Sequence, residues 1–450
     1  MNKKQRLVLV VSILASVVSA IDGFIVNVAL PTISRDLGGG LVVQQWTVDA
    51  YLLTLGSLIL IAGSLSDLFG RKRILMAGLI WFGIASLLCA LAPNGTFLIF
   101  ARALQGIGGA LLVPSSLALI ISAFSGPAQG KAIGTWTAWF SVATIVGPLL
   151  GGLIVAATSW RWIFGVNVLP IAVTIWLLRQ VEQPEAIKSS TKIDTLGAIL
   201  CAIGLGAPVF ALIEQPSYGW GNPLIWIPLA AGAVASAAFI RYEAWNKAPM
   251  LPLSLFRVRN FSAGNIATLT IYAGLSVSSF LLIITLQQVG GYSALQASVA
   301  TMPISIVMFF LSGRFGALAG RYGPRLFMTA GPLTAAVGFL LMLRVQAHIS
   351  YFGGLLPGLL LFALGLSMTV APLTSAVLSQ IDPKNAGVAS AVNNAVARVA
   401  GLIAIALVGV ITGPHLDIAG FHRALIVVAV LLTVGGISSY VGIRNVRPAS

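Results

Sequence analysis

The chain has 450 residues, of which 58% are hydrophobic and only 8% are charged, and its mean hydropathy is +0.98. A soluble globule of this length needs far more polar surface, so the composition excludes one and indicates an integral membrane protein. The net charge of +15 does not indicate a nucleic-acid partner, because the basic residues lie between apolar runs, where they act as orientation signals.

The apolar runs are long and continuous, which predicts membrane-spanning helices of roughly 20 residues each. Barrel strands would instead show shorter segments of alternating hydrophobicity, so we expect an all-α fold. The fourteen expected spans are residues 7–30, 46–66, 74–92, 97–121, 132–157, 163–181, 195–214, 223–241, 263–285, 295–315, 327–346, 352–378, 387–411 and 422–442.

A polar linker at 182–193 follows the first six spans and divides the chain. We expect three regions: an N-terminal six-helix bundle at 1–181, a linker region with two additional central helices at 182–262, and a C-terminal six-helix bundle at 263–450. The two cysteines, Cys89 and Cys201, lie near opposite ends of their spans and are not expected to pair.

The positions of the basic residues predict the orientation of these spans. With both termini in the cytoplasm, twenty of the 26 Lys and Arg residues lie on the cytoplasmic side. The four on the outer side are Arg35, Arg161, Arg344 and Arg423. Such a bias is typical of multi-pass proteins of the cell membrane. It also supports the number of spans, because one missed helix would place every later basic residue on the opposite side of the membrane.

The sharpest polar interruption is Gly63–Arg73, with the sequence GSLSDLFGRKR, and a weaker copy at Gly316–Leu326 follows 253 residues later. The pattern resembles the loop between the second and third helices of the major facilitator superfamily of transporters. The resemblance implies that Gly63, Asp67, Gly70 and Arg71 belong to a gating loop, and the second copy implies two homologous halves. The alternative is a plain basic turn between two spans.

Two charged residues lie inside the expected spans of the first half, where charge is costly and therefore informative. Asp22 lies about 13 Å from the outer end of the first span, and Arg102 lies about 7.5 Å from the outer end of the fourth. Both are in the outer half of the membrane, so we expect them to share one polar cavity. An acid there can bind or release a proton as its surroundings change. The alternative is a static ion pair between two helices.

Three further motifs resemble the fourteen-span drug:proton antiporter family. These are Ile21–Pro31 (IDGFIVNVALP), which departs from the family at Phe24, Arg102–Ala110 (RALQGIGGA) and Gly147–Gly152 (GPLLGG). The resemblance implies that Asp22 and Arg102 take part in proton coupling. The antiporter motif comprises Gly147, Pro148, Gly151 and Gly152, whose small residues and proline also suit simple helix packing.

Other polar side chains within the spans are candidates for lining a cavity or for being satisfied inside the bundle: Asn27, Gln105, Asn393, Asn394 and Arg398. The acids Asp49 and Glu214 lie near the outer ends of their spans, and we expect them to be solvated. No phosphate-binding glycine loop is present, so the proton gradient is the expected energy source, and no cofactor or metal is expected.

These observations favour a proton-coupled antiporter that exports amphipathic, cationic or neutral small molecules by alternating access. The expected partners are the substrate, protons and the lipid bilayer, with no nucleic acid, and a monomer is expected. A proton-coupled transporter of a dedicated nutrient or metabolite on the same fold is the alternative. An enzyme is not expected, because no catalytic constellation is evident.

Overall fold

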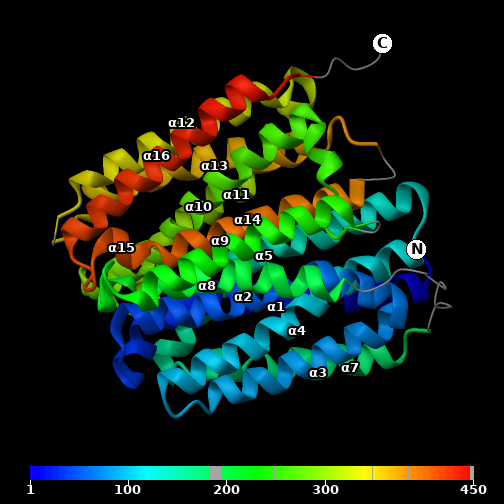
Figure 1. Cartoon of the computed structure of the whole chain (residues 1–450), viewed down its shortest axis with the longest axis horizontal. Coiled ribbons are helices and arrows are strands. Elements are labelled where there is room, and N and C mark those ends of the chain that lie inside the picture. The colour runs from blue at the N-terminus through cyan, green and yellow to red at the C-terminus, as the bar shows by residue number, and fades with distance from the viewer. Residues whose placement is uncertain (183–193, 247–248, 347, 383–385, 446–450) are drawn as a thin grey trace. The chain divides into compact units, whose positions relative to one another are not determined.

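The computed structural model describes residues 1–182, 194–246, 249–346, 348–382 and 386–445 (Figure 1). All regular structure in these ranges is helical. The α-helices are α1 Lys3–Leu37, α2 Gly40–Phe69, α3 Arg71–Ala90, α4 Gly95–Ala123, α5 Gly126–Ala157, α6 Trp162–Gly165, α7 Val168–Arg179, α8 Thr195–Tyr218, α9 Pro223–Trp245, α10 Arg259–Gln288, α11 Ala294–Tyr322, α12 Pro324–Leu341, α13 Leu356–Leu378, α14 Ala386–Ala406, α15 Val408–Thr412 and α16 Ile418–Gly442. Three short helical turns are η1 Leu253–Arg257, η2 Met342–Arg344 and η3 Tyr351–Leu355.

Thirteen helical segments of the described residues are long and apolar enough to cross a membrane. The second expected span is not among the thirteen; it corresponds to α2, which is 30 residues long. The prediction of an all-α multi-pass protein is therefore confirmed. Several helices extend beyond the apolar runs that predicted them, because polar residues near a membrane surface are compatible with a continuing helix.

The chain forms two compact units. Unit 1 comprises Met1–Ala207, Ala230–Met250 and Ser293–Ser298, and unit 2 comprises the remainder, Pro208–Leu229, Leu251–Tyr292 and Val299–Ser450. The expected boundaries at 181 and 262 stay a prediction.

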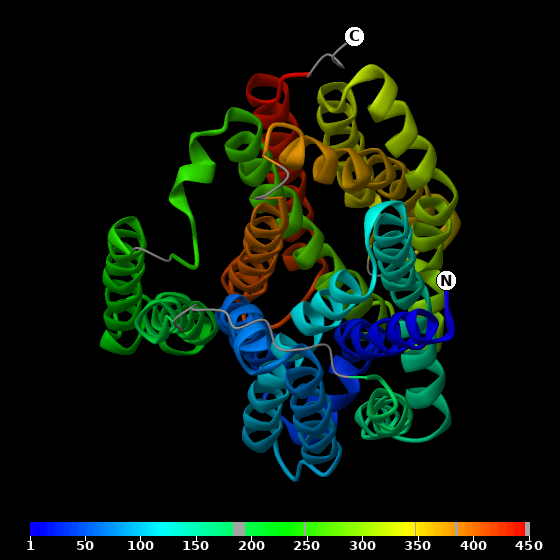
Figure 2. The same ribbon diagram turned by 90° about the vertical axis from the view of Figure 1, so that its right-hand side faces the viewer.

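Close glycine contacts hold the helices of unit 1 together. In both ribbon views α3 and α4 run side by side (Figures 1 and 2). A Cβ atom added at Gly108 on α4 would lie 2.8 Å from the backbone nitrogen of Phe82 on α3. The absence of a side chain at Gly108 is therefore what lets the two backbones approach.

Several neighbour relations of unit 1 recur in unit 2. The α1 contacts with α4, α5 and α7 have counterparts in the α10 contacts with α13, α14 and α16. The pairing of α3 with α4 likewise has its counterpart in α12 with α13, where Gly331 and Gly365 meet backbone to backbone. This repetition supports the two homologous halves expected from the repeated loop pattern.

The turns at the repeated loop pattern are shorter than expected. Gly63 lies within α2, which continues to Phe69, so the polar stretch forms the last turns of a helix. A single residue separates α2 from α3: Gly70, with a φ of 96°. Gly323, also 253 residues later, separates α11 from α12 with a φ of 88°. Only glycine adopts such φ values without strain, which explains why the pattern keeps glycine at both places.

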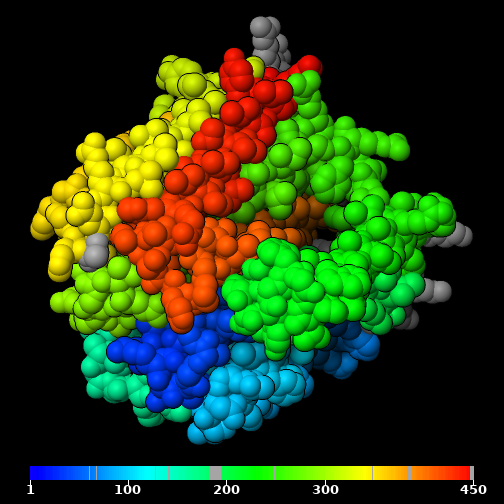
Figure 3. Space-filling model, turned by 60° about the vertical axis from the view of Figure 1, so that its left-hand side comes forward, coloured from blue at the N-terminus to red at the C-terminus, as the bar shows by residue number. Residues whose placement is uncertain are grey.

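One exposed face of α16, on the surface of unit 2, is apolar. The last helix, α16, is red in Figure 3 and forms a ridge on the surface beside α12, which is yellow. Along α16, Val430, Val434, Ile437 and Val441 are exposed and lie on one face, at helical spacing. Such a face suits contact with lipid chains.

Candidate functional site

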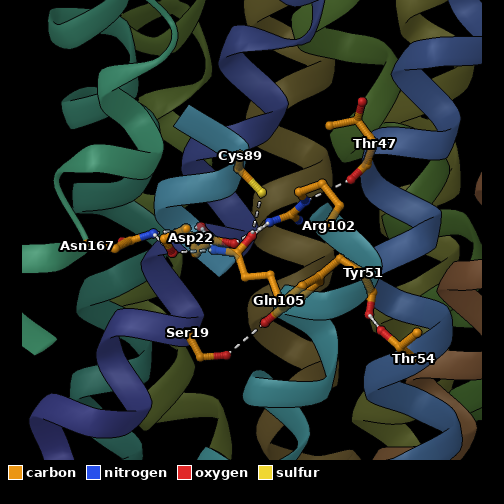
Figure 4. Close-up of polar contacts among 10 residues, drawn as sticks. Ser19, Asp22, Thr47, Tyr51, Thr54, Cys89, Arg102, Gln105 and Asn167 are labelled. Atoms are coloured by element: carbon orange, nitrogen blue, oxygen red, sulfur yellow. Dashed lines mark hydrogen bonds and ion pairs between the residues drawn. The ribbon is translucent and has the colours of Figure 1, made fainter. Parts of the chain in front are cut away.

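Three donors surround the carboxylate of Asp22, which lies in the middle of α1 (Figure 4). Arg102 Nη1 on α4 donates to Asp22 Oδ2 at 2.6 Å. Gln105 Nε2 donates to Oδ1 at 2.9 Å, and Asn167 Nδ2 donates to the same oxygen at 2.8 Å. Both carboxylate oxygens are thus engaged, and every contact is one that a carboxylate anion accepts.

Arg102 is held as firmly as its partner. Its Nε donates to the carbonyl oxygen of Thr47 on α2 at 2.9 Å, and its Nη1 also donates to Gln105 Oε1 at 2.5 Å. The guanidinium carbon lies 4.3 Å from the ring centre of Tyr51 and 5.7 Å from that of Phe164. Such cation–π contacts favour the charged side chain in a dry environment. The arginine therefore connects α1, α2 and α4.

Further hydrogen bonds fix the neighbouring groups. Ser86 Oγ accepts from Gln105 Nε2 at 2.8 Å, while Ser19 and Tyr51 share a hydrogen bond of 2.8 Å between their hydroxyl groups. The Cys89 thiol lies 3.7 Å from Gln105 Oε1. The network thereby extends into α3 without adding another charge (Figure 4).

Local sequence explains why these groups converge. Gln105 follows Arg102 by three residues, so both side chains lie on the same face of α4. A Cβ atom at Gly106 would collide with the backbone oxygen of Tyr51, so this glycine lets α2 come close enough for the Thr47 carbonyl to reach Arg102. Asn167 lies in the two-residue interruption between α6 and α7.

The pair is sealed from solvent. Asp22 is 0% exposed and Arg102 is 1% exposed, and Gln105 is also completely buried. The structure thus brings the two predicted residues together, but not in the polar cavity that the sequence led us to expect. A buried pair of this kind is costly to desolvate, and it is stable only while both partners and their additional hydrogen bonds are present.

The gating-loop residues lie away from this pair. Gly63 is helical, and a Cβ atom there would meet nothing within 4 Å, so close approach does not require it to be glycine. Gly70 forms the turn described above, and Arg71 begins α3. The backbone of Asp67 lies in α2, and its side chain lies outside the described residues. Lys72, the residue after Arg71, donates to the carbonyl oxygens of Arg179 and Val181, which links the α2–α3 turn to the end of α7.

Two glycines of the antiporter motif, Gly147 and Gly151, line the contact between α5 and α1, whereas Gly152 faces the first residues of α11. A Cβ atom at Gly147 would lie 2.8 Å from Phe24 Cβ, and one at Gly151 would lie 2.8 Å from Ile25 Cγ1 and 3.0 Å from the Ile25 backbone oxygen. Pro148 lies within α5 without interrupting it, and Gly152 lies one residue after Gly151 in the same helix. The motif therefore brings α5 against the part of α1 that carries Asp22.

The five residues considered for a cavity lining have different surroundings. Gln105 belongs to the sealed network around Asp22. The half-buried Asn27 has an Oδ1 atom with no hydrogen-bond partner among the described residues. Asn393 is bonded within its own bundle, Asn394 is exposed, and Arg398 is half-buried in α14.

Sequence reasoning placed one acid wrongly. Asp49 on α2 is 0% exposed rather than solvated, and neither of its carboxylate oxygens has a hydrogen-bond partner among the described residues. Hydropathy alone could not reveal this, because α2 begins at Gly40, which moves Asp49 about 13 Å inward from the helix start. Asn167 was also missed as a partner of Asp22, since no spacing rule connects residues 145 positions apart.

The fold and the buried pair define a multi-pass membrane protein of the transporter type. The model of the Major Facilitator Superfamily matches residues 12–405, and the chain belongs to this superfamily. It is 33% identical over 428 residues to the multidrug resistance protein Stp of Mycobacterium tuberculosis, covering 93% of this chain and 79% of Stp. It is 32% identical to the methylenomycin A resistance protein of Bacillus subtilis, covering 90% of this chain and 87% of that protein. Among solved structures, a bacterial homologue of the human lysosomal transporter Spinster, inward-facing and unoccupied, matches with a TM-score of 0.70 at 14% identity, over 98% of this chain and 97% of that one.

Proposed function

We propose that the chain is a proton-coupled antiporter that exports amphipathic small molecules by alternating access. Membership of a transporter superfamily and similarity to proteins named for drug resistance support this proposal. The single observation that carries the proton coupling is the pair of Asp22 and Arg102, buried together inside one unit. Charged side chains inside a membrane are energetically costly, and they mark sites such as proton pathways.

The geometry suggests how protonation acts on the helices. As an anion, Asp22 ties α1 to α4 through Arg102 and to the α6–α7 turn through Asn167. Protonation removes the charge that attracts the guanidinium, while Thr47 and Gln105 still offer it oxygen acceptors. The α1 contact is then weakened while the α2 and α4 contacts persist. Because α5 packs on α1 through Gly147 and Gly151, a shift of α1 is transmitted to the antiporter motif.

Contacts at the two ends of unit 1 support the proposed orientation of the chain. Lys4 pairs with Glu182 at 2.7 Å, and Lys72 binds the end of α7, so the N-terminus, the α2–α3 turn and the start of the linker share one end. Asp36 and Arg161 pair at the other end at 2.7 Å. Together with the positive-inside bias, this supports a cytoplasmic location for both termini, with Asp67 and Arg71 at an inner gate.

The proposed partners are protons, the bilayer and an amphipathic molecule that is cationic or neutral overall, handled by a monomer without a catalytic step. The test is transport by purified protein in proteoliposomes with an imposed pH gradient and a panel of lipophilic cations and neutral drugs. Substrate moving against the proton flux supports antiport. Substrate moving with the protons favours the alternative, a transporter of a dedicated nutrient or metabolite.

A further inference from the structure

The end of α16 is held by two arginines from neighbouring helices. Arg259, the first residue of α10, donates from Nε to the Gly442 carbonyl oxygen at 3.0 Å and from Nη2 to the Val441 carbonyl oxygen at 2.9 Å. Arg325, the second residue of α12, donates from Nε to the Tyr440 carbonyl oxygen at 2.8 Å. Three successive carbonyl groups at the negative end of the helix dipole are thus satisfied, and two cationic side chains are brought together there.

Capping does not use all the donors of these two arginines. Nη1 of Arg259 and both Nη atoms of Arg325 have no hydrogen-bond partner among the described residues. The Arg325 guanidinium carbon lies 4.6 Å from the ring centre of Tyr440, and this tyrosine is 58% exposed. A guanidinium with N–H groups to spare, resting on an aromatic ring at the surface, can still bind an anionic oxygen.

More arginines than acids lie at this end of unit 2. Consecutive spans alternate in direction, so the starts of α10 and α12 lie at the same end as the last residues of α11, α13 and α16. The described arginines at this end are Arg257, Arg259, Arg321, Arg325 and Arg444. Of the three acids in the sequence of unit 2, Asp382 follows α13 at this end, whereas Glu214 near the end of α8 and Asp417 at the start of α16 lie at the other. This end therefore carries a surplus of positive charge.

An apolar stripe leads along α16 to the two arginines. The exposed residues of the stripe, on the ridge that α16 forms in Figure 3, are Val430, Val434, Ile437 and Val441. Tyr440 follows Ile437 by three residues, so its ring lies beside the stripe. The 25 residues of α16 span about 37 Å, which exceeds the hydrocarbon thickness of about 30 Å. The last turn of α16 therefore lies at the level of the lipid headgroups while the stripe faces acyl chains.

The equivalent place in unit 1 has a different charge. Lys72, which lies 253 residues before Arg325, donates to two carbonyl oxygens at the end of α7. Glu182 lies just beyond this cap and pairs with Lys4 at 2.7 Å. A basic cap is thus common to α7 and α16, but the residue just beyond it is an acid in unit 1, whereas Arg444 lies there in unit 2.

We infer that the end of α16, with Arg259, Arg325 and Tyr440, binds one anionic phospholipid. The spare N–H groups of the two arginines bind the headgroup phosphate, and the Tyr440 hydroxyl is one more donor beside them. An acyl chain of the same molecule lies along the apolar stripe, a contact that a free phosphate ion cannot make. The lipid fastens α10 and α12 to the end of α16, because its headgroup contacts side chains from all three helices.

Two lipids with the same acyl chains test the site. Dioleoyl phosphatidylglycerol has a net negative charge, and dioleoyl phosphatidylcholine has none. Native mass spectrometry of the purified protein, titrated with each lipid in neutral detergent, gives the dissociation constant of the first bound lipid. We expect the wild type to bind phosphatidylglycerol about tenfold or more tightly than phosphatidylcholine, because each arginine near the membrane surface favours an anionic lipid. The double variant Arg259→Gln with Arg325→Gln should lose this preference.

Arg423→Gln is the matched control. Arg423 on α16 also donates to two carbonyl oxygens, those of Ile411 at 2.9 Å and Thr412 at 2.6 Å, but near the opposite end of the helix. This variant removes a cap of the same kind outside the proposed site, so its affinity for phosphatidylglycerol should stay within about twofold of that of the wild type. Equal wild-type affinities for the two lipids, or an equal loss of phosphatidylglycerol binding in Arg423→Gln, would overturn the site.

A second measurement uses only the wild type, so no variant needs to fold. A phosphatidylglycerol analogue with a photoactivatable diazirine in its acyl chain is crosslinked to the protein in phosphatidylcholine nanodiscs, and the labelled peptides are mapped. We expect adducts at 430–441 of α16 that excess unlabelled phosphatidylglycerol suppresses and inorganic phosphate does not. Adducts spread evenly over the exposed helices would rule out a defined lipid site, and suppression by inorganic phosphate would show an anion site without a lipid.

Discussion

Asp22 and Arg102 are 80 residues apart in the sequence, and their side chains are joined by a 2.6 Å ion pair from which solvent is excluded. Asp36 and Arg161 form a second pair in the same unit at 2.7 Å, but their side chains are 48% and 38% exposed. The two ion pairs have similar N···O distances but different burial, so the exposed pair is a control for the buried one. Burial decides how much stability is lost when one partner of a pair is removed.

We predict that Asp22→Asn lowers the stability of the purified protein by about 3–5 kcal/mol, because it leaves the Arg102 charge buried without its counter-ion. Asp36→Asn should cost roughly 0.2–1 kcal/mol, since water screens the exposed pair. Thermal unfolding in detergent, followed by intrinsic fluorescence, compares the two variants. Equal melting temperatures for Asp22→Asn and Asp36→Asn would show that the buried pair does not stabilise the fold.

The double variant Asp22→Asn with Arg102→Gln removes both buried charges. We predict that it recovers most of the stability lost in Asp22→Asn, because replacing a whole buried pair by neutral groups avoids a stranded charge. Melting temperatures of the four members of this cycle supply the test. A double variant less stable than either single variant would contradict the pairing energy assigned here.

Glycine packing in the antiporter motif gives a further prediction. Gly151→Ala places a methyl group 3.0 Å from the Ile25 backbone oxygen and should cost about 1–3 kcal/mol. Gly134 lies in the same helix and has no atom within 4 Å of an added Cβ, so Gly134→Ala should be neutral or stabilising by up to about 1 kcal/mol. Thermal unfolding of both variants is the measurement. A harmless Gly151→Ala would remove the packing explanation for the motif.

The turn between α2 and α3 gives another prediction, which concerns the repeated loop pattern. Gly70→Ala and Gly323→Ala should each cost about 1–3 kcal/mol, because their φ values of 96° and 88° strain any residue with a Cβ atom. Gly63→Ala should be tolerated, since Gly63 is helical and its Cβ position is open. The test compares the yield and melting temperature of the three variants with those of the wild type in parallel preparations. Loss of stability in Gly63→Ala alone would reverse the roles assigned to these glycines.

Orientation in the membrane can be measured directly. Cysteines introduced at Ser217 and Ser293 are predicted to react with an impermeant thiol reagent added to intact cells, whereas one at Ser189 should not. The reason is the positive-inside bias, which places the linker after residue 181 in the cytoplasm. The native cysteines are replaced in the control protein. Labelling at Ser189 without labelling at Ser217 would invert the topology.

Much of the fold followed from hydropathy, because a membrane leaves few options besides apolar helices of sufficient length. The ends of the helices did not follow. The second span was expected to end at residue 66, yet α2 continues to Phe69, since polar residues at a membrane surface are compatible with a helix and the turn at Gly70 ends it. The sixth expected span is divided into α6 and α7 at Asn167, which periodicity did not indicate.

The central pair of the candidate site was predictable because charge inside a span is rare, so Asp22 and Arg102 stood out. Its neutral partners were not. Gln105 was foreseeable from its three-residue spacing on α4, whereas Asn167 depends on a tertiary contact that no local pattern encodes. Asp49 was misplaced for the same reason, since its burial is decided by packing and not by its distance from the end of an apolar run.

Proton-driven transport by a protein that has lost the Asp22 carboxylate shows whether Asp22 is the proton carrier. The double variant Asp22→Asn with Arg102→Gln, with its expected recovered stability, is reconstituted beside the wild type and given the same imposed pH gradient with rhodamine 123. We predict that the gradient drives dye accumulation in wild-type vesicles, and that vesicles with the variant accumulate no more dye than protein-free vesicles, although the variant binds the dye. Accumulation by the variant at the wild-type rate would contradict Asp22 as the proton carrier and would direct attention to Asp49.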